Sequence, residues 1–190
     1  MQRYILTGAP GAGKTAILRQ LEADGASVVE EAATDVIALE HALGRDEPHA
    51  RPDFIDKIIG LQGRRQLAAA ARPDAVQIHD RSPVCTYALS RFLNFPASPI
   101  LAAELARIEA EGVYQRWVLF IENLGFVTPT AARRISFADT LRFEIVHEQV
   151  YQELGYELVR IEPGALGDRV AAVQRAISLA GLLRSSEQPV

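Results

Sequence analysis

Short apolar stretches alternate along this chain with longer segments in which apolar residues recur every three or four positions. Short apolar runs bounded by polar or turn-forming residues indicate buried strands, which we predict at 3–7, 27–30, 75–79, 116–121 and 156–161. Helical spacing predicts helices at 15–23, 32–43, 52–71, 82–93, 100–111, 140–154 and 165–183. Strands that alternate with helices form βαβ units, so the expected fold class is a three-layer α/β domain around a five-stranded parallel sheet.

This pattern continues to the end of the last predicted helix. We therefore expect one domain at residues 1–184 and a flexible tail at 185–190. The longest predicted connection is 123–137, a mixed Gly, Pro, Thr and Arg segment that contains Arg133 and Arg134. Connections of this length in compact domains are often lids over an active site.

A glycine-rich segment follows the first predicted strand directly and precedes the first predicted helix. Residues 8–15 read Gly-Ala-Pro-Gly-Ala-Gly-Lys-Thr and match the phosphate-loop pattern GxxxxGK[ST]. The glycines allow backbone turns in which successive N–H groups converge on phosphates, and the positive end of the following helix strengthens that field. The predicted nucleotide-binding residues are Gly8, Ala9, Pro10, Gly11, Ala12, Gly13, Lys14, Thr15 and Ala16.

The two polar residues of this motif have distinct expected roles. Lys14 would place its ammonium against the β- and γ-phosphates of ATP, and the hydroxyl of Thr15 would coordinate Mg²⁺. A dinucleotide fingerprint, Gly11-x-Gly13-x-x-Ala16, also fits the segment. That fingerprint requires its first glycine at the end of the strand and leaves the Lys-Thr pair without a role, so we favour the phosphate loop.

The third predicted strand ends at an acid followed by an arginine, Asp80-Arg81. Ligands of open α/β sheets bind at the carboxyl ends of the strands, which places Asp80 beside the phosphate loop. Asp80 could hold the Mg²⁺ shell or accept the proton of a substrate hydroxyl, and Arg81 could bridge phosphate oxygens. Alternatively, the two residues pair with each other and cap the next helix, for which Ser82 is the predicted N-cap.

Composition narrows the class of protein. Apolar residues make up 48% of the 190 residues, and the net charge is −4 without a basic stripe, so nucleic acid is not an expected partner. The single Cys85 excludes an internal disulfide and fits a reducing cytosol. No apolar run reaches the roughly 18 residues of a membrane span. We expect a cytoplasmic protein with a nucleotide and a small molecule as partners; a homodimer is compatible with the sequence.

Together, the phosphate loop, the acid after the second strand and Asp80-Arg81-Ser82 resemble the P-loop kinases of small metabolites. The likeness is closest to the AAA-type ATPase family that includes bacterial nicotinamide riboside kinase. It implies a P-loop NTPase fold, Asp80 as the base or Mg²⁺-linked acid, Arg81 as a phosphate contact and Glu31 as the acid that opens the substrate side. This chain has Thr34 at a position where such kinases often have Arg.

Two functions fit these residues. The favoured one is a kinase that moves the γ-phosphoryl group of ATP to the hydroxyl of a nucleoside-like metabolite, with the lid residues Arg133 and Arg134 neutralising charge on the phosphates. The other is a switch or binding module that hydrolyses ATP or GTP without an acceptor. The chain lacks the Asn-Lys-x-Asp sequence of typical GTPases, and its length leaves little room for the sensor domain of a motor ATPase.

Overall fold

Five parallel strands form the centre of the computed structural model, which describes residues 1–125 and 136–187, with side chains to residue 181 in the last helix. The sheet order is β2-β3-β1-β4-β5. The strands are β1 (Gln2–Thr7), β2 (Ser27–Val29), β3 (Val76–Asp80), β4 (Trp117–Ile121) and β5 (Glu157–Ile161). Every pairing is parallel, which confirms the predicted α/β fold class.

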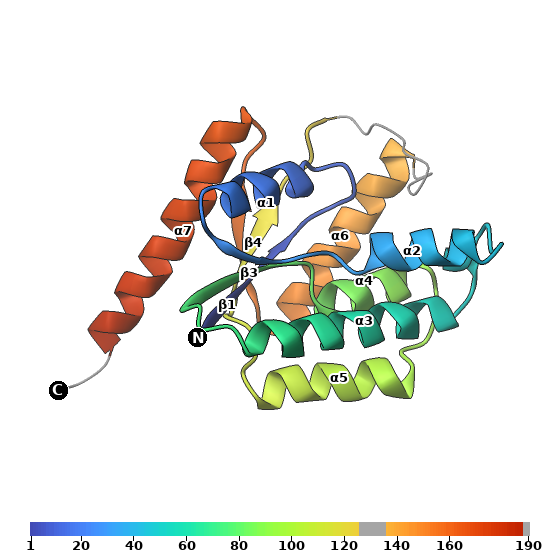
Figure 1. The fold of residues 1–190 in the computed structure, drawn as a ribbon. Helices are drawn as coiled ribbons and strands as arrows, with labels where there is room; N and C mark the ends of the chain where they lie inside the picture. The colour runs from blue at the N-terminus through green and yellow to red at the C-terminus, as the bar shows by residue number, and fades with distance from the viewer. Residues whose placement is uncertain (126–135, 188–190) are drawn as a thin grey trace.

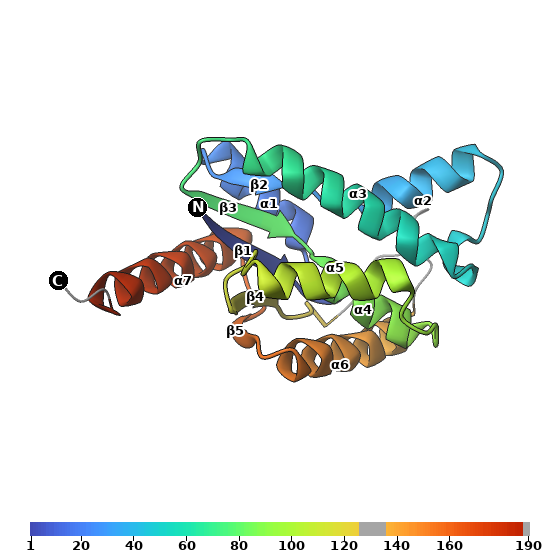
Figure 2. The ribbon, with the colours of Figure 1, turned by 90° about the horizontal axis from the view of Figure 1, so that it is seen from below.

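Helices cover both faces of the sheet (Figures 1 and 2). They are α1 (Lys14–Ala23), α2 (Ala33–Ala42), α3 (Asp53–Ala70), α4 (Pro83–Phe92), α5 (Pro99–Ala110), α6 (Phe137–Glu153) and α7 (Leu166–Glu187), with a 3₁₀ turn at Pro48–Ala50. Alternate residues of β1 face opposite cores: Tyr4 and Leu6 pack with α1 and α7, whereas Ile5 packs with α4, α5 and α6. This alternation produces the three layers.

Two helix boundaries differ from the sequence prediction by more than one residue. Helix α6 begins at Phe137 rather than 140, because the hydroxyl of Ser136 accepts a hydrogen bond from the backbone N–H of Asp139 (3.1 Å) and caps the first turn. Helix α7 extends beyond the predicted end at 183 and into the predicted tail, ending at Glu187.

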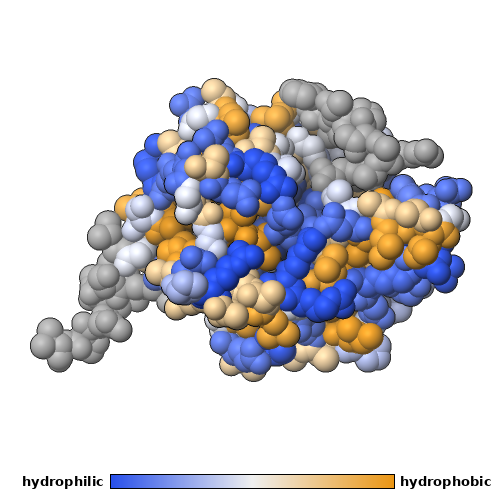
Figure 3. All heavy atoms as spheres, in the orientation of Figure 1, coloured by the Kyte–Doolittle hydropathy of each residue, from blue (hydrophilic) through white to orange (hydrophobic). Residues whose placement is uncertain are grey.

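The surface in Figure 3 is polar over much of its area, with several apolar patches. One of them lies at α2, where Leu39 and, directly after the helix, Leu43 are exposed. None of the helices in the described part of the chain combines the length and the apolar character that crossing a membrane requires.

The register of the sheet brings the carboxyl ends of three strands together. Leu6 of β1 lies opposite Asp80 of β3 on one side and Leu119 of β4 on the other. The chain leaves β1 through Gly8, whose backbone has φ +133° and passes so close to β4 that a Cβ there would stand 2.2 Å from the carbonyl oxygen of Ile121. Only glycine fits this crossing.

We expect Gly8→Ala to destabilise the fold more than Gly25→Ala. Both glycines have positive φ, but a Cβ at Gly25 meets nothing within 4 Å. The control variant Gly25→Ala should therefore lower the free energy of unfolding only by the backbone strain, about 1–2 kcal/mol, or a few degrees in melting temperature. Gly8→Ala adds the collision with Ile121 and should also abolish nucleotide binding. Thermal unfolding of both variants measures the difference, and equal melting temperatures would contradict the proposed close approach.

Candidate active site

The phosphate-loop sequence lies between the end of β1 and the start of α1. Gly8, Gly11 and Gly13 have φ of +133°, +82° and +82°, conformations that side chains with a Cβ rarely adopt. Gly13 is the N-cap of α1, so the helix begins at Lys14. Residues 8–16 thus form the strand–turn–helix arrangement that anion binding by backbone N–H groups requires.

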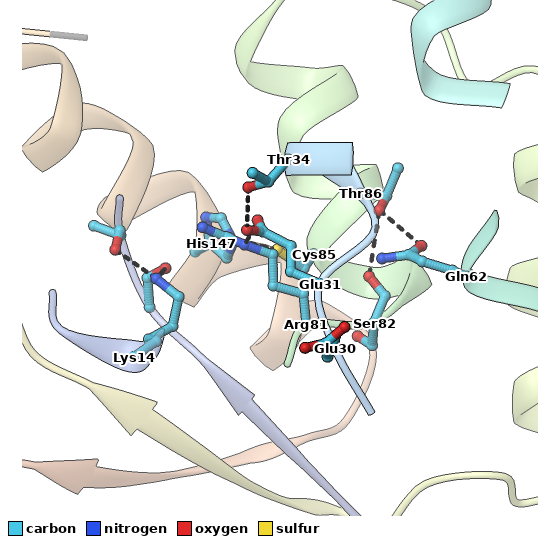
Figure 4. Close-up of polar contacts among 12 residues, drawn as sticks. Lys14, Glu30, Glu31, Thr34, Gln62, Arg81, Ser82, Cys85, Thr86 and His147 are labelled. Carbon is cyan, nitrogen blue, oxygen red and sulfur yellow. Dashed lines mark hydrogen bonds and ion pairs between the residues drawn. The ribbon is translucent and has the colours of Figure 1, made fainter. Parts of the chain in front are cut away.

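Lys14 is turned inward along the loop. Its side chain is 4% exposed, and Nζ donates hydrogen bonds to the carbonyl oxygens of Gly8 (2.9 Å) and Ala9 (2.7 Å) (Figure 4). The loop therefore holds the ammonium at its inner side, where a phosphate chain would meet it. Thr15, in the first turn of α1, is exposed.

Arg81 stands directly after β3 in a backbone conformation that is rare for its residue type. It has φ +70°, and its backbone N–H donates to the carbonyl of Leu6 (3.0 Å). Strain of this kind costs about 1–3 kcal/mol and persists where surrounding contacts enforce it. Here the contacts are specific: Nε donates to Glu31 Oε1 (2.5 Å) and Nη1 to Cys85 Sγ (3.0 Å). Burial opposes the charged guanidinium, but Cys85 and the carboxylates of Glu31 and Asp80 raise the pKa of Arg81 above its ordinary value.

Glu31 follows β2 and joins the site from the neighbouring strand. One carboxylate oxygen accepts from Arg81, and the other accepts from the hydroxyl of Thr34 (2.8 Å). Arg65 of α3 donates to the main-chain carbonyl of Glu31 and to the carboxylate of Asp35, which anchors this segment. The structure thus brings two predicted substrate-side residues, Glu31 and Arg81, into one ion pair. Thr34 helps to orient the carboxylate of Glu31 through its hydroxyl.

A buried thiol and a buried histidine lie behind Arg81. His147 of α6 has its Nε2 2.8 Å from Cys85 Sγ and its Nδ1 3.2 Å from the carbonyl of Phe143. A carbonyl only accepts, so Nδ1 carries the proton and Nε2 accepts from the thiol. Burial, with the charges of Arg81 and Lys14, holds the pKa of His147 well below its usual value, which agrees with a neutral ring. Cys85 in turn accepts from Arg81 and so fixes the guanidinium in place.

Ser82 occupies the predicted N-cap position of α4 but does not cap the helix with its side chain. Its hydroxyl lies 2.9 Å from the phenolic oxygen of Tyr151 on α6. The predicted capping hydrogen bond was therefore wrong, because a tertiary partner competes for the same hydroxyl. Pro83 does occupy the first turn of α4 as expected.

The predicted lid lies mostly outside the described residues, and so do Arg133 and Arg134. Polar contacts hold the chain where β4 leads into that segment. Glu122 binds Arg160 (3.2 Å), and the amide of Asn123 donates to Glu144 (3.0 Å). Glu122 is therefore engaged at the β5 side of the sheet.

The predicted Mg²⁺ ligands are a hydroxyl and a carboxylate, the hard oxygen donors that this ion prefers. Thr15 lies in the first turn of α1, and Asp80, 6% exposed, ends the strand beside β1. Both belong to the same edge of the sheet, so the donor set fits a nucleotide-bound Mg²⁺.

Sequence reasoning missed two buried residues of this site, His147 and Arg169. His147 lies four positions from Phe143 and three from Val150, so it falls within the apolar stripe of α6. A histidine in such a stripe signals a buried polar contact. Arg169 of α7 donates to the carbonyl of Ala12 in the phosphate loop (2.6 Å), and no local pattern marks it.

Comparison with known proteins assigns the family. A family model described as an AAA domain matches residues 3–169. The chain belongs to this AAA domain family. A search of curated proteins gives no match.

Solved structures share the fold of this AAA domain. A NadR protein in complex with NAD and AMP-PNP superposes with a TM-score of 0.66 at 16% identity, over 92% of this chain and 49% of that chain. This AAA domain therefore spans about half the length of the NadR chain. A deoxyadenosine kinase from M. mycoides, with the products dcmp and dcdp bound, superposes with a TM-score of 0.58 at 13% identity, over 93% and 99% of the two chains.

We expect Cys85→Ala to destabilise the AAA domain by about 1–3 kcal/mol, because it leaves Nε2 of His147 without a donor and Nη1 of Arg81 without its acceptor. Cys85→Ser is the matched control, since a hydroxyl can accept from Arg81 and donate to His147. Urea unfolding of both variants gives the comparison. Equal losses in the two variants would show that the thiol acts only by filling space.

His79, beside Asp80 in β3, gives a pH-dependent prediction. Burial, then the charges of Arg3 and Arg72, lowers the pKa of His79 to about 3, so the folded protein keeps the ring neutral. The unfolded chain takes up a proton below pH ~6.5, so stability from this residue is present above that pH and is lost as pH falls towards 3.

His79→Phe preserves an aromatic ring against Tyr114, whose ring centroid lies 5.2 Å away. Between pH 7 and 5 the variant should lose about 2 kcal/mol less unfolding free energy than the native protein. The exposed His41→Asn should follow the native protein. Denaturant unfolding at the two pH values tests this, and a His79→Phe loss equal to the native loss would refute it.

Proposed function

We propose that this AAA domain is a kinase that transfers the γ-phosphoryl group of Mg·ATP to a hydroxyl of a small, nucleoside-like metabolite. The observation that carries the proposal is the buried Arg81–Glu31 ion pair at the edge of the sheet that also holds the phosphate loop. A nucleotide switch needs the loop and the metal but has no use for an oriented acid two strands away. An acceptor hydroxyl does need such an acid. NadR and deoxyadenosine kinase support the proposal through their shared fold.

Strand order separates the roles of the two acids. Asp80 ends β3, the immediate neighbour of β1, whereas Glu31 follows β2, one strand further out. Adjacent strands lie about 4.8 Å apart, so Asp80 is the nearer acid to the phosphate loop and suits the Mg²⁺ shell. Glu31 lies further towards the acceptor side and suits the acceptance of a hydroxyl proton.

The positively charged side chains are the proposed phosphate contacts. Lys14 would contact the β- and γ-phosphates, and Arg81 would stabilise charge on the transferred group while it positions Glu31. Arg133 and Arg134 remain proposed lid residues that bring further positive charge to the phosphates. Helices α2 to α5 would enclose the acceptor. Thr86 of α4 and Gln62 of α3, whose side chains are joined by a 3.0 Å hydrogen bond, lie beyond Glu31 and Arg81 in Figure 4 and offer polar contacts to it.

Steady-state ADP production from Mg·ATP, alone and with a panel of nucleosides, nucleotides and vitamin-like metabolites, tests the proposal. One acceptor should raise turnover and yield a phosphorylated product. Lys14→Ala should lower kcat/KM by about 10²–10³-fold, and Glu31→Gln should lower kcat by about 10²–10⁴-fold if Glu31 is the base.

The remaining variants separate the two acids. Asp80→Asn should raise the Mg²⁺ concentration required for half-maximal turnover, a change that Glu31→Gln should not produce. Glu22→Gln neutralises an exposed acid that pairs with Arg19 on α1 and should leave turnover unchanged. ATP hydrolysis that no acceptor raises, and that survives Glu31→Gln, would indicate a switch or binding module instead.

A further inference from the structure

Arg169 lies in the first turn of α7 and points at the back of the phosphate loop. The residue is buried, with only 4% of its surface exposed. Nη2 donates to the carbonyl oxygen of Ala12 (2.6 Å) and to that of Glu122 (3.2 Å). Nη1 stands 2.8 Å from the point that a Cβ on Gly13 would occupy. The guanidinium therefore contacts the last two residues before Lys14.

The charge of Arg169 has no acidic partner within the described part of the chain. The ion pairs found there engage other arginines, for example Arg81 with Glu31 and Arg160 with Glu148, and Nε of Arg169 makes no hydrogen bond to a described residue. Burial lowers the pKa of Arg169, and no neighbouring charge offsets this effect. Buried charges are normally paired. The N-terminal end of α7 is itself positive, which makes the position still less favourable for a cation.

The hydrogen bond to Ala12 has a geometric consequence for the phosphate loop. The peptide bonds of the described residues are trans, so the carbonyl of Ala12 and the N–H of Gly13 point to opposite sides of their shared peptide plane. With the carbonyl held by Arg169 behind the loop, the N–H of Gly13 is directed towards its phosphate-binding side. A cation on the carbonyl also polarises the peptide and strengthens the N–H as a donor.

We propose that Arg169 is a nucleotide-binding determinant: the phosphates held by the loop supply the missing negative charge, and Arg169 supports them through the Ala12–Gly13 peptide. The ligand class is a nucleoside di- or triphosphate, since the site requires a phosphate chain seated in the loop. The residue does not touch the transferred group and is a positioning residue. This inference depends on the phosphate loop alone and is independent of which acceptor, if any, the protein phosphorylates.

The test is calorimetric binding of ADP, AMP and Mg·ATP to Arg169→Met and Arg169→Lys. Arg169→Met should weaken ADP and Mg·ATP binding by about 10-fold or more, equivalent to ~1.4 kcal/mol, and should reduce the preference for ADP over AMP. Arg169→Lys keeps the charge and should bind ADP more tightly than Arg169→Met does. Arg175→Met, at an exposed position of the same helix, is the control and should bind as the native protein does.

Thermal unfolding without nucleotide accompanies these measurements and separates binding from folding. The proposal requires that the melting temperature of Arg169→Lys stays near the native value while the affinities differ as described. It is overturned if Arg169→Met binds ADP like the native protein, or if both variants lose affinity and unliganded stability equally, which would make Arg169 a structural brace. ADP binding without any acceptor-dependent turnover would refute the kinase proposal and leave this one intact.

Discussion

Burial of charge at the carboxyl edge of the sheet is the constraint on which the site depends. Lys14, Arg81 and Arg169 are each less than a tenth exposed, and they converge on an edge to which Glu31 and Asp80 contribute carboxylates. Charges removed from water need partners, and among these five described side chains the cations outnumber the carboxylates. In the proposed nucleotide complex, a phosphate chain would supply further negative charge. Lys14 and Arg169 also donate to backbone carbonyls of the loop, whose dipoles help to solvate the two charges.

Arg81 connects this electrostatic requirement to the packing of the fold. The hydrogen bond from its backbone N–H to the carbonyl of Leu6 holds its strained backbone in place. Its guanidinium donates through Nε to Glu31 and through Nη1 to Cys85. Cys85 is held by His147, whose ring is fixed by the carbonyl of Phe143. The orientation of Glu31 therefore depends on helix α6, which supplies His147 on the side of Arg81 where Cys85 lies. A neutral His147 is essential to this chain of contacts, because a second cation beside Arg81 would repel it.

The sequence was sufficient for features that a local pattern encodes. The phosphate loop is a contiguous motif between a strand and a helix, and Asp80 was located because an apolar run ends there. Contacts between distant residues were not accessible in this way. Glu31 meets Arg81 only because β2 pairs with β3, and Cys85 meets His147 only because α4 and α6 share one face of the sheet. The cap at Ser136 was missed for a different reason: the pattern Ser136-x-x-Asp139 marks a helix start, but it stands three residues before the apolar spacing from which the helix was predicted.

Strand order also determines where the polar residues of the site lie relative to one another. Moving outward from β1, the sheet presents first the phosphate loop, then Asp80 at the end of β3, then Glu31 after β2. Arg81 follows Asp80 in the chain and is bound to Glu31. In the proposed kinase it would contact a phosphoryl group and also orient the carboxylate that accepts the hydroxyl proton. Phosphoryl transfer requires donor, transferred group and acceptor roughly in line. In the proposed kinase, Asp80 as the metal acid, Arg81, and Glu31 as the acceptor acid would follow one another along this edge, in an order that the strand order fixes.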